Sequence, residues 1–158
     1  AGVRLGDTID KDMIALPIGP PLRMAVAASP GYFKTHPKPK HPRDLMNHRC
    51  INMRMQSGGG LFVWDFQRKG QQVNVRVEGQ LVINTSPTIV DAALAGLGVA
   101  WLPDGEFDPH IEEGRLVRVL QDWCAPFAGY YLYYPSRRQP SPAFSLVVDA
   151  LRDEMAYR

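Results

Sequence analysis

The sequence has few of the residues and motifs that mark the commonest enzymes and disulfide-bonded proteins. Cys50 and Cys124 are the only cysteines among its 158 residues. Two cysteines are too few for a disulfide framework, and they lack the C-x-x-C spacing of redox and zinc sites, so we expect reduced thiols, with a single bridge as the alternative. The motifs GxSxG, HExxH, GxxxxGK(S/T) and a helix-opening GxGxxG are also absent. These absences weigh against the commonest hydrolases and nucleotide-binding enzymes, and we expect a protein that is not an enzyme.

Long hydrophobic runs and targeting signals are missing as well. No stretch approaches the run of about eighteen apolar residues that a membrane-spanning helix needs. The opening residues, AGVRLGDTID, have neither the basic nor the apolar region of a signal peptide. We therefore expect no contact with a membrane and a cytoplasmic location. The chain begins directly on a predicted strand, with no turn, cap or methionine before it, which suggests a piece of a longer protein.

Dense clusters of one charge sign are absent too. The formal net charge is +2, with six excess positive charges in residues 1–79 and four excess negative charges in residues 80–158. The basic residues of the first half are dispersed, without the interleaved aromatic residues expected of a nucleic-acid surface. We interpret them as a solvated face and predict no DNA binding by these residues.

The clearest pattern that is present runs from Asn84 to Pro103. Ser86 is a suitable N-cap, and Pro87 suits the first helical position because its missing N–H is not needed there. Gly98 is placed for the left-handed residue that follows a helix ending near Leu97. The predicted helix has an apolar stripe at i, i+3, i+4 and i+8, formed by Ile89, Ala92, Ala93 and Leu97.

The same segment contains a candidate ligand site. The apolar run 99–102, closed by Pro103, predicts a buried strand of a parallel sheet. A loop that leads into a helix N-terminus presents free N–H groups and the positive end of the helix dipole. Asn84, Thr85 and Ser86 could therefore hold a small anionic or polar ligand. The alternative is that these three residues only cap the helix, because caps of this composition are common.

Strands and helices alternate along the rest of the chain. Strands are predicted at 2–6, 22–28, 50–53, 81–83, 116–120 and 130–135, and Ser-Pro pairs at 29–30 and 141–142 open helices. A hairpin is predicted over 61–79, with Val73, Val75 and Val77 on one face. The last helix has an apolar stripe of Phe144, Val147, Val148 and Leu151. This alternation predicts an α/β fold with helices packed on a mainly parallel sheet.

Two other groups of polar residues are weaker candidates for a site. His41, His48 and Cys50 have a spacing that matches no usual zinc site, and a fourth ligand is missing, so we predict no metal and no cofactor. The carboxylates between Asp104 and Glu113 are most simply an exposed acidic helix. Three polar loops that follow predicted strands remain, and they are Arg4 to Gly6, Met55 to Gly60 and Asn84 to Ser86. Ligands of open α/β sheets bind at the carboxyl ends of strands, so we expect these loops to converge on one crevice.

The order of these segments resembles the effector-binding domain of LysR-type transcriptional regulators. The resemblance covers nearly the whole chain and is carried by AGVRLG, PLRMAVAASPGYFKTHPKPKHPRDLMNHRCINMRM, GQLVINTSPTIVDAALAGLGVAWLP, GRLVRVL and YYLYYPSRRQPSPAFSLVVDALR. It implies a fold like periplasmic binding proteins, with two Rossmann-like lobes joined by crossover strands and a small effector bound between them. The family's N-terminal winged helix-turn-helix and the first part of the first lobe have no counterpart here.

The resemblance also implies boundaries, partners and contact residues. Residues 1–21 would belong to the incomplete first lobe and a crossover, 22–120 to the second lobe, and 121–158 to the crossover back and the C-terminal helix. The implied partners are a small polar or anionic effector, further copies of the chain in a homodimer or homotetramer, and promoter DNA, which would be bound only through the absent N-terminal domain. The implied effector contacts are Arg4, Leu5, Gly6, Met55, Gln56, Ser57, Gly58, Asn84, Thr85 and Ser86, with Pro103 at the rim.

Two alternatives to a regulator share parts of this description. A solute-binding receptor of a transporter has the same architecture, and a signal peptide upstream would favour it, whereas a helix-turn-helix would exclude it. A small α/β enzyme is the second alternative, which the missing catalytic motifs disfavour.

Overall fold

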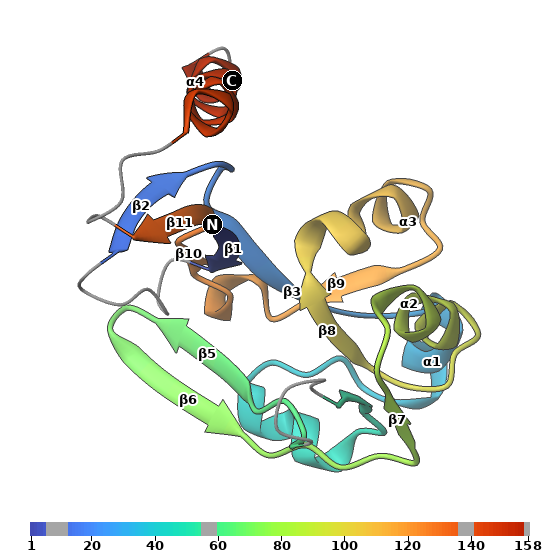
Figure 1. Ribbon diagram of the computed structural model, residues 1–158. Helices are drawn as coiled ribbons and strands as arrows, with labels where there is room; N and C mark the ends of the chain where they lie inside the picture. The colour runs from blue at the N-terminus through green and yellow to red at the C-terminus, as the bar shows by residue number, and fades with distance from the viewer. Residues whose placement is uncertain (6–12, 55–59, 136–140, 157–158) are drawn as a thin grey trace. The chain divides into compact units, whose positions relative to one another are not determined.

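A computed structural model provides the structure of the chain and describes residues 1–5, 13–54, 60–135 and 141–156 (Figure 1). The chain forms two compact units. Unit 1 comprises the described residues of 1–22 and 126–158, and unit 2 comprises those of 23–125. Because unit 1 uses both ends of the chain, its core depends on segments that are far apart in sequence.

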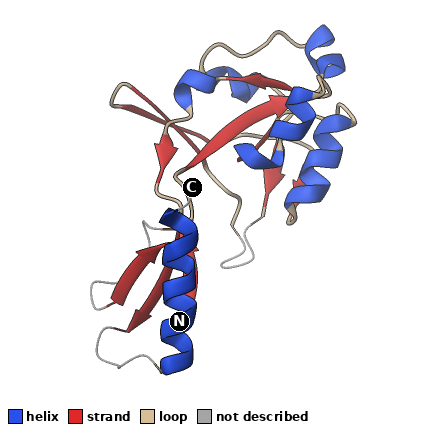
Figure 2. Cartoon of the chain, turned by 90° about the horizontal axis from the view of Figure 1, so that it is seen from above, coloured by secondary structure: helices blue, strands red, loops and turns tan. Residues whose placement is uncertain are grey.

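Unit 1 is an antiparallel sheet with one helix. The strand order is β1 (Gly2–Leu5), β11 (Tyr130–Pro135) and β2 (Met13–Pro17). The helix α4 (Pro142–Ala156) lies over one face of this sheet (Figure 2), and the rings of Phe144 and Tyr134 meet edge to face with centroids 5.1 Å apart. A two-residue strand, β10 (Pro126–Phe127), precedes β11.

Unit 2 is organised around β3 (Leu22–Ala28). It pairs antiparallel with β8 (Ala100–Pro103) and with β9 (Val117–Val119). Further along, β4 (Ile51–Met53) pairs parallel with β7 (Leu81–Ile83). A parallel bridge joins Cys50 to Val99, so β4 and β8 run in the same direction.

The pairings differ from the mainly parallel sheets that the sequence predicted. Strand pairings in the described part of the chain are mostly antiparallel, including all of those given for unit 1. In unit 2 the antiparallel pairings arise from the direction of β3. The strands β4, β7, β8 and β9 share one direction, but β3 runs against both of its neighbours and converts their pairings into antiparallel ones. The fold class is therefore mixed α/β.

Both faces of β3 and β8 are buried. On one face, Ala25 and Ala27 belong to a hydrophobic cluster that also contains the helix residues Ile89 and Ala93. On the other face, Val26 and Trp101 belong to a second hydrophobic cluster. Alternate strand residues point to opposite faces, which explains why these strands consist of continuous apolar runs.

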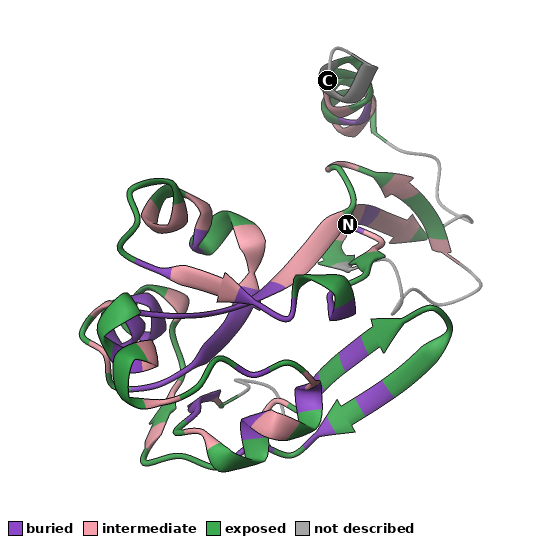
Figure 3. Ribbon diagram, turned by 180° about the vertical axis from the view of Figure 1, so that it is seen from behind, coloured by how far each residue is buried: buried purple, intermediate pink, exposed green. Residues whose placement is uncertain are grey.

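Short helices and a hairpin cover the two faces. The helices are α1 (Pro30–Thr35), η2 (Pro42–Asn47), α2 (Ser86–Leu94), η3 (Asp104–Glu106), α3 (Asp108–Glu112) and η4 (Gln121–Trp123). The hairpin pairs β5 (Trp64–Arg68) with β6 (Gln71–Val75). Buried and exposed residues alternate along its strands (Figure 3), and Val73, Val75 and Val77, which were predicted to share one face, are all buried.

Three details of the predicted helices are wrong. The helix α2 ends at Leu94 rather than near Leu97, whose side chain is 52% exposed. Gly96 has the positive φ of 76°, while Gly98 is needed because a Cβ there would lie 2.4 Å from the carbonyl oxygen of Arg49. On α4, Val148 is buried but Val147 is exposed, so the stripe is narrower than predicted.

No helix within the described residues is long and apolar enough to cross a membrane.

Candidate functional site

The loop at the start of α2 is the strongest of the predicted site segments. Asn84 and Thr85 are exposed and Ser86 is half-buried. Thr85 is the N-cap, which corrects the prediction of Ser86, and its side chain makes no capping hydrogen bond. Its hydroxyl instead donates to the hydroxyl of Thr88 at 2.8 Å. The first turn of α2 is therefore left without the side-chain acceptor that usually satisfies its N–H groups.

The sheet of unit 2 brings some of the predicted residues to one edge. Because β7, β4 and β8 run in the same direction, their carboxyl ends lie at the same edge. The segment Asn84 to Ser86 follows β7, and Pro103 ends β8, so these residues share that edge. The predicted Gly6 and the segment Met55 to Gly58 lie outside the described residues.

The other predicted contacts belong to unit 1. Arg4 is exposed on β1, and its guanidinium lies over the ring of Tyr133 at 5.4 Å from the centroid. A cation is attracted to the face of an aromatic ring, so this contact orients the Arg4 side chain on the sheet. Leu5 is the last residue of β1 and pairs with Tyr130.

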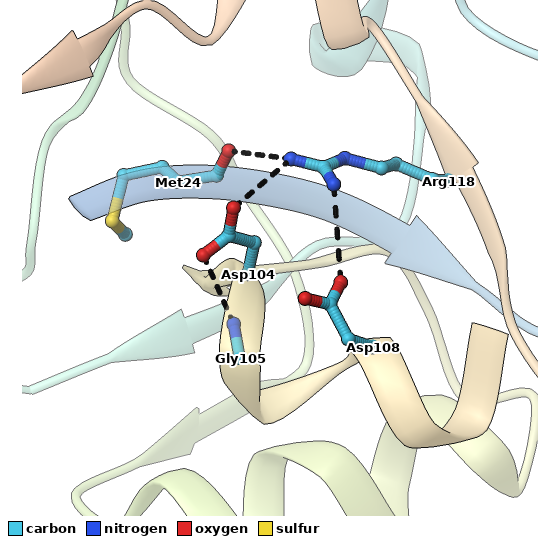
Figure 4. A network of polar contacts seen from close by, with 5 residues as sticks. All are labelled: Met24, Asp104, Gly105, Asp108 and Arg118. Atoms are coloured by element: carbon cyan, nitrogen blue, oxygen red, sulfur yellow. Dashed lines mark hydrogen bonds and ion pairs between the residues drawn. The ribbon is translucent and has the colours of Figure 1, made fainter. Parts of the chain in front are cut away.

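An ion-pair network lies beside Pro103 and was not predicted from the sequence. The guanidinium of Arg118 on β9 lies 3.7 Å from the carboxylate of Asp104 and 3.9 Å from that of Asp108, and it donates to the carbonyl oxygen of Met24 at 3.4 Å (Figure 4). Asp104 also accepts the N–H of Gly105. Asp104 and Asp108 are half-buried, so the prediction of a wholly exposed acidic helix is wrong for them. The network ties η3 and α3 to the start of β3.

His48 and Cys50, two of the residues weighed as metal ligands, have structural partners in unit 2. Nδ1 of His48 lies 3.1 Å from the hydroxyl of Tyr32, and Cys50 donates weakly to the carbonyl oxygen of Leu45 at 3.6 Å. Burial raises the pKa of the Cys50 thiol to about 12 and that of Cys124 to about 11. Both thiols are therefore protonated and unreactive at neutral pH. In the part of the chain that the structure describes, no group of three or more potential metal-ligating residues occurs.

Comparison with known proteins shows which family the chain resembles. A sequence model of the LysR substrate binding domain matches residues 1–156. The chain is 79% identical over 152 residues to a predicted transcriptional regulator of Pseudomonas aeruginosa and 45% identical over 152 residues to the HTH-type transcriptional regulator PgrR of Escherichia coli. Each match covers 96% of this chain, with 50% and 51% of the respective relative.

Solved structures agree with the sequence comparison. The regulatory domain of AphB from Vibrio vulnificus is similar with a TM-score of 0.78 and 29% identity, over 99% of this chain and 74% of that one. The full-length Vibrio cholerae virulence activator AphB gives a TM-score of 0.79 with 26% identity, over 96% of this chain and 50% of that one.

The mixed α/β fold and the matches define the chain as a regulatory domain. It belongs to the family of LysR substrate-binding domains, which confirms the resemblance seen in the sequence. This family is not an enzyme family, so the expectation that the chain is not an enzyme is also confirmed, and LysR transcription regulators are cytoplasmic. The chain spans about half the length of the curated relatives it matches.

Proposed function

We propose that the chain senses a small polar or anionic effector for a LysR-type transcriptional regulator. In this proposal the units are parts of two lobes, and the effector contacts Asn84, Thr85 and Ser86, with Pro103 at the rim. Arg4 and Leu5, together with Gly6 and Met55 to Gly58, would complete the contacts.

The uncapped start of α2 is the observation that carries this proposal. Helix N-termini are satisfied by side chains, water or ligands, and here the N-cap side chain of Thr85 bonds to Thr88 instead of the backbone. The N–H groups of the first turn and the positive end of the helix dipole favour an anionic group by about 0.3–1 kcal/mol. The cap-only alternative requires a capping side chain, and neither Thr85 nor Ser86 supplies one.

Effector binding would act through two states of a larger assembly. A ligand shifts an equilibrium between conformations only if its affinity for the two conformations differs. We infer that occupancy of the site changes the arrangement of subunits in a homodimer or homotetramer. A helix-turn-helix elsewhere in the regulator would then bind promoter DNA differently in the two arrangements.

The test uses the complete regulator and compares substitutions of Asn84 and Thr85 with a substitution of another exposed asparagine, Asn74. Small organic acids and polar metabolites are first screened for a rise in melting temperature, and the affinity of the best compound is then measured by calorimetry. Asn84→Ala and Thr85→Ala should each weaken binding by about 1 kcal/mol, which is roughly fivefold and the usual scale of one lost hydrogen bond. Asn74→Ala, an exposed substitution on β6, serves as the control and should leave the affinity unchanged.

Two outcomes would count against the proposal. Equal affinities of Asn84→Ala, Thr85→Ala and Asn74→Ala would place the effector elsewhere. A large drop in the melting temperature of Thr85→Ala without effector would show that the residue acts as a cap after all.

A further inference from the structure

A polar pocket lies at the C-terminal end of α2, within unit 2, and is called the second pocket to distinguish it from the proposed effector site. It has a volume of about 740 Å³ and is lined by segments that are distant in sequence. They are α1 with the residue at each end of it, the loop before β4, the end of α2 and the turn between α3 and β9. Pockets of about 300–1,000 Å³ are the size that binds small molecules. None of the residues proposed to contact the effector lines this pocket.

The pocket has a cationic side and an apolar side. Arg49, Arg115 and His36 supply the polar side, together with the hydroxyl of Thr35. Leu94 and Pro30 supply apolar surface. Glu113 binds the guanidinium of Arg115 at 2.5 Å and offsets its charge. No ion pair involving Arg49 occurs among the described residues, so Arg49 provides the uncompensated positive charge.

The polar side is held in place by contacts within unit 2. The hydroxyl of Tyr32 accepts the backbone N–H of Arg49 at 3.0 Å, and the ring of Tyr32 stacks on His36 with centroids 4.2 Å apart. The backbone N–H of Arg115 donates to the carbonyl oxygen of His110 at 2.8 Å. These contacts fix the backbones that carry the cations while the guanidinium of Arg49 stays exposed. Such preorganisation lowers the entropic cost of binding.

We propose that this pocket binds a small organic anion, with its carboxylate or phosphate at Arg49 and His36 and its apolar part against Leu94 and Pro30. Arginine forms paired hydrogen bonds with carboxylate and phosphate groups, which gives the charge a defined position. The apolar part distinguishes this ligand from an inorganic anion, because Leu94 and Pro30 offer no hydrogen-bond donors.

The test uses the complete regulator and two probes that differ only in charge. The affinities of 4-bromobenzoate and of its neutral analogue 4-bromobenzamide are measured by calorimetry, and the bromine atom is located by anomalous scattering in a crystal. We expect 4-bromobenzoate to bind at least tenfold more tightly than the amide, with bromine beside Leu94. Arg49→Gln should weaken its binding about tenfold, while Arg43→Gln, an exposed substitution on η2 outside the pocket, should have no effect.

Three results would overturn the inference. They are equal affinities of the two probes, no binding of 4-bromobenzoate up to millimolar concentration, and equal affinities of Arg49→Gln and Arg43→Gln. If Asn84→Ala abolishes binding of 4-bromobenzoate and Arg49→Gln does not, the probe occupies the proposed effector site and this inference fails while the proposed function stands. Loss of the effector response in Asn84→Ala has no bearing on the pocket, since the two sites share no residue.

Discussion

At the scale of single residues, two polar side chains of unit 2, Ser29 and Asp44, bind backbone groups within four residues of themselves. Ser29 accepts the N–H of Tyr32 at 3.1 Å and so caps α1, and Asp44 accepts the N–H groups of His41 and Lys40. These two backbone bonds, that of His41 first, lower the pKa of the Asp44 carboxyl. The Tyr32 hydroxyl accepts the N–H of Arg49 and so joins two of the segments that line the second pocket, α1 and the loop before β4.

The stability of unit 2 should depend on pH through His48. Burial lowers the pKa of His48 below its usual 6.5, and the nearby charge of His36 lowers it further, against an opposing effect of Asp44. The unfolded chain therefore binds a proton at His48 more readily than the folded chain does, and stability is lost as the pH falls below about 6.5.

The measurement is the free energy of unfolding between pH 7.5 and pH 5.5 for the natural chain and for His48→Gln. We expect a smaller loss of stability over this range in His48→Gln, because glutamine does not titrate. Parallel curves for the two proteins would show that other groups are responsible. The comparison uses slopes, since the substitution also removes the contact with Tyr32 at every pH.

At the scale of elements, burial decides which of the predicted apolar residues contribute to the free energy of unfolding. The adjacent valines of α4 provide a matched pair, with Val148 6% exposed and Val147 52% exposed. Val148→Ala should lower the free energy of unfolding by about 1.5–3 kcal/mol, from the lost methyl groups and the cavity left behind. Val147→Ala should change it by no more than about 0.5 kcal/mol. Urea unfolding of both variants measures the difference, and equal losses would mean that α4 packs by another face.

Local patterns predicted many of the elements, whereas features set by distant contacts were missed. The start of α1 was predicted because its cap, Ser29, is three residues from its partner. The end of α2 was missed because Gly98 is required by contact with the carbonyl oxygen of Arg49, a distant segment. Strand direction was missed because an apolar run such as β3 is the same in a parallel or an antiparallel pairing.

The candidate site was predicted only in part for the same reason. The loop Asn84 to Ser86 carries a local signal, a polar segment ahead of a helix, and the structure describes it. The ion pairs of Arg118 with Asp104 and Asp108 join β9 to η3 and α3, and no local sequence pattern connects these residues. The second pocket combines residues of several distant segments, so it becomes visible only in the folded chain.

At the scale of the whole molecule, the chain is a LysR-type effector-binding regulatory domain. The chain matches about half the length of relatives such as PgrR of Escherichia coli. Its own charge is +2, and its basic residues are dispersed, whereas specific DNA binding needs a helix or ribbon presented to a groove. The 158-residue chain by itself should therefore give no sequence-dependent gel shift at moderate salt. A shift that distinguishes promoter from unrelated DNA would contradict this expectation.

The central claim is that the effector binds at the N-terminus of α2. The most direct measurement is a crystal structure of the complete regulator with its effector, identified by the melting-temperature screen. We predict ligand density within hydrogen-bond distance of the first-turn N–H groups of α2 and of Asn84 or Thr85, with a polar or anionic group nearest to them. Ligand density that contacts none of residues 84–86, with a water or a side chain satisfying these N–H groups instead, would contradict the account.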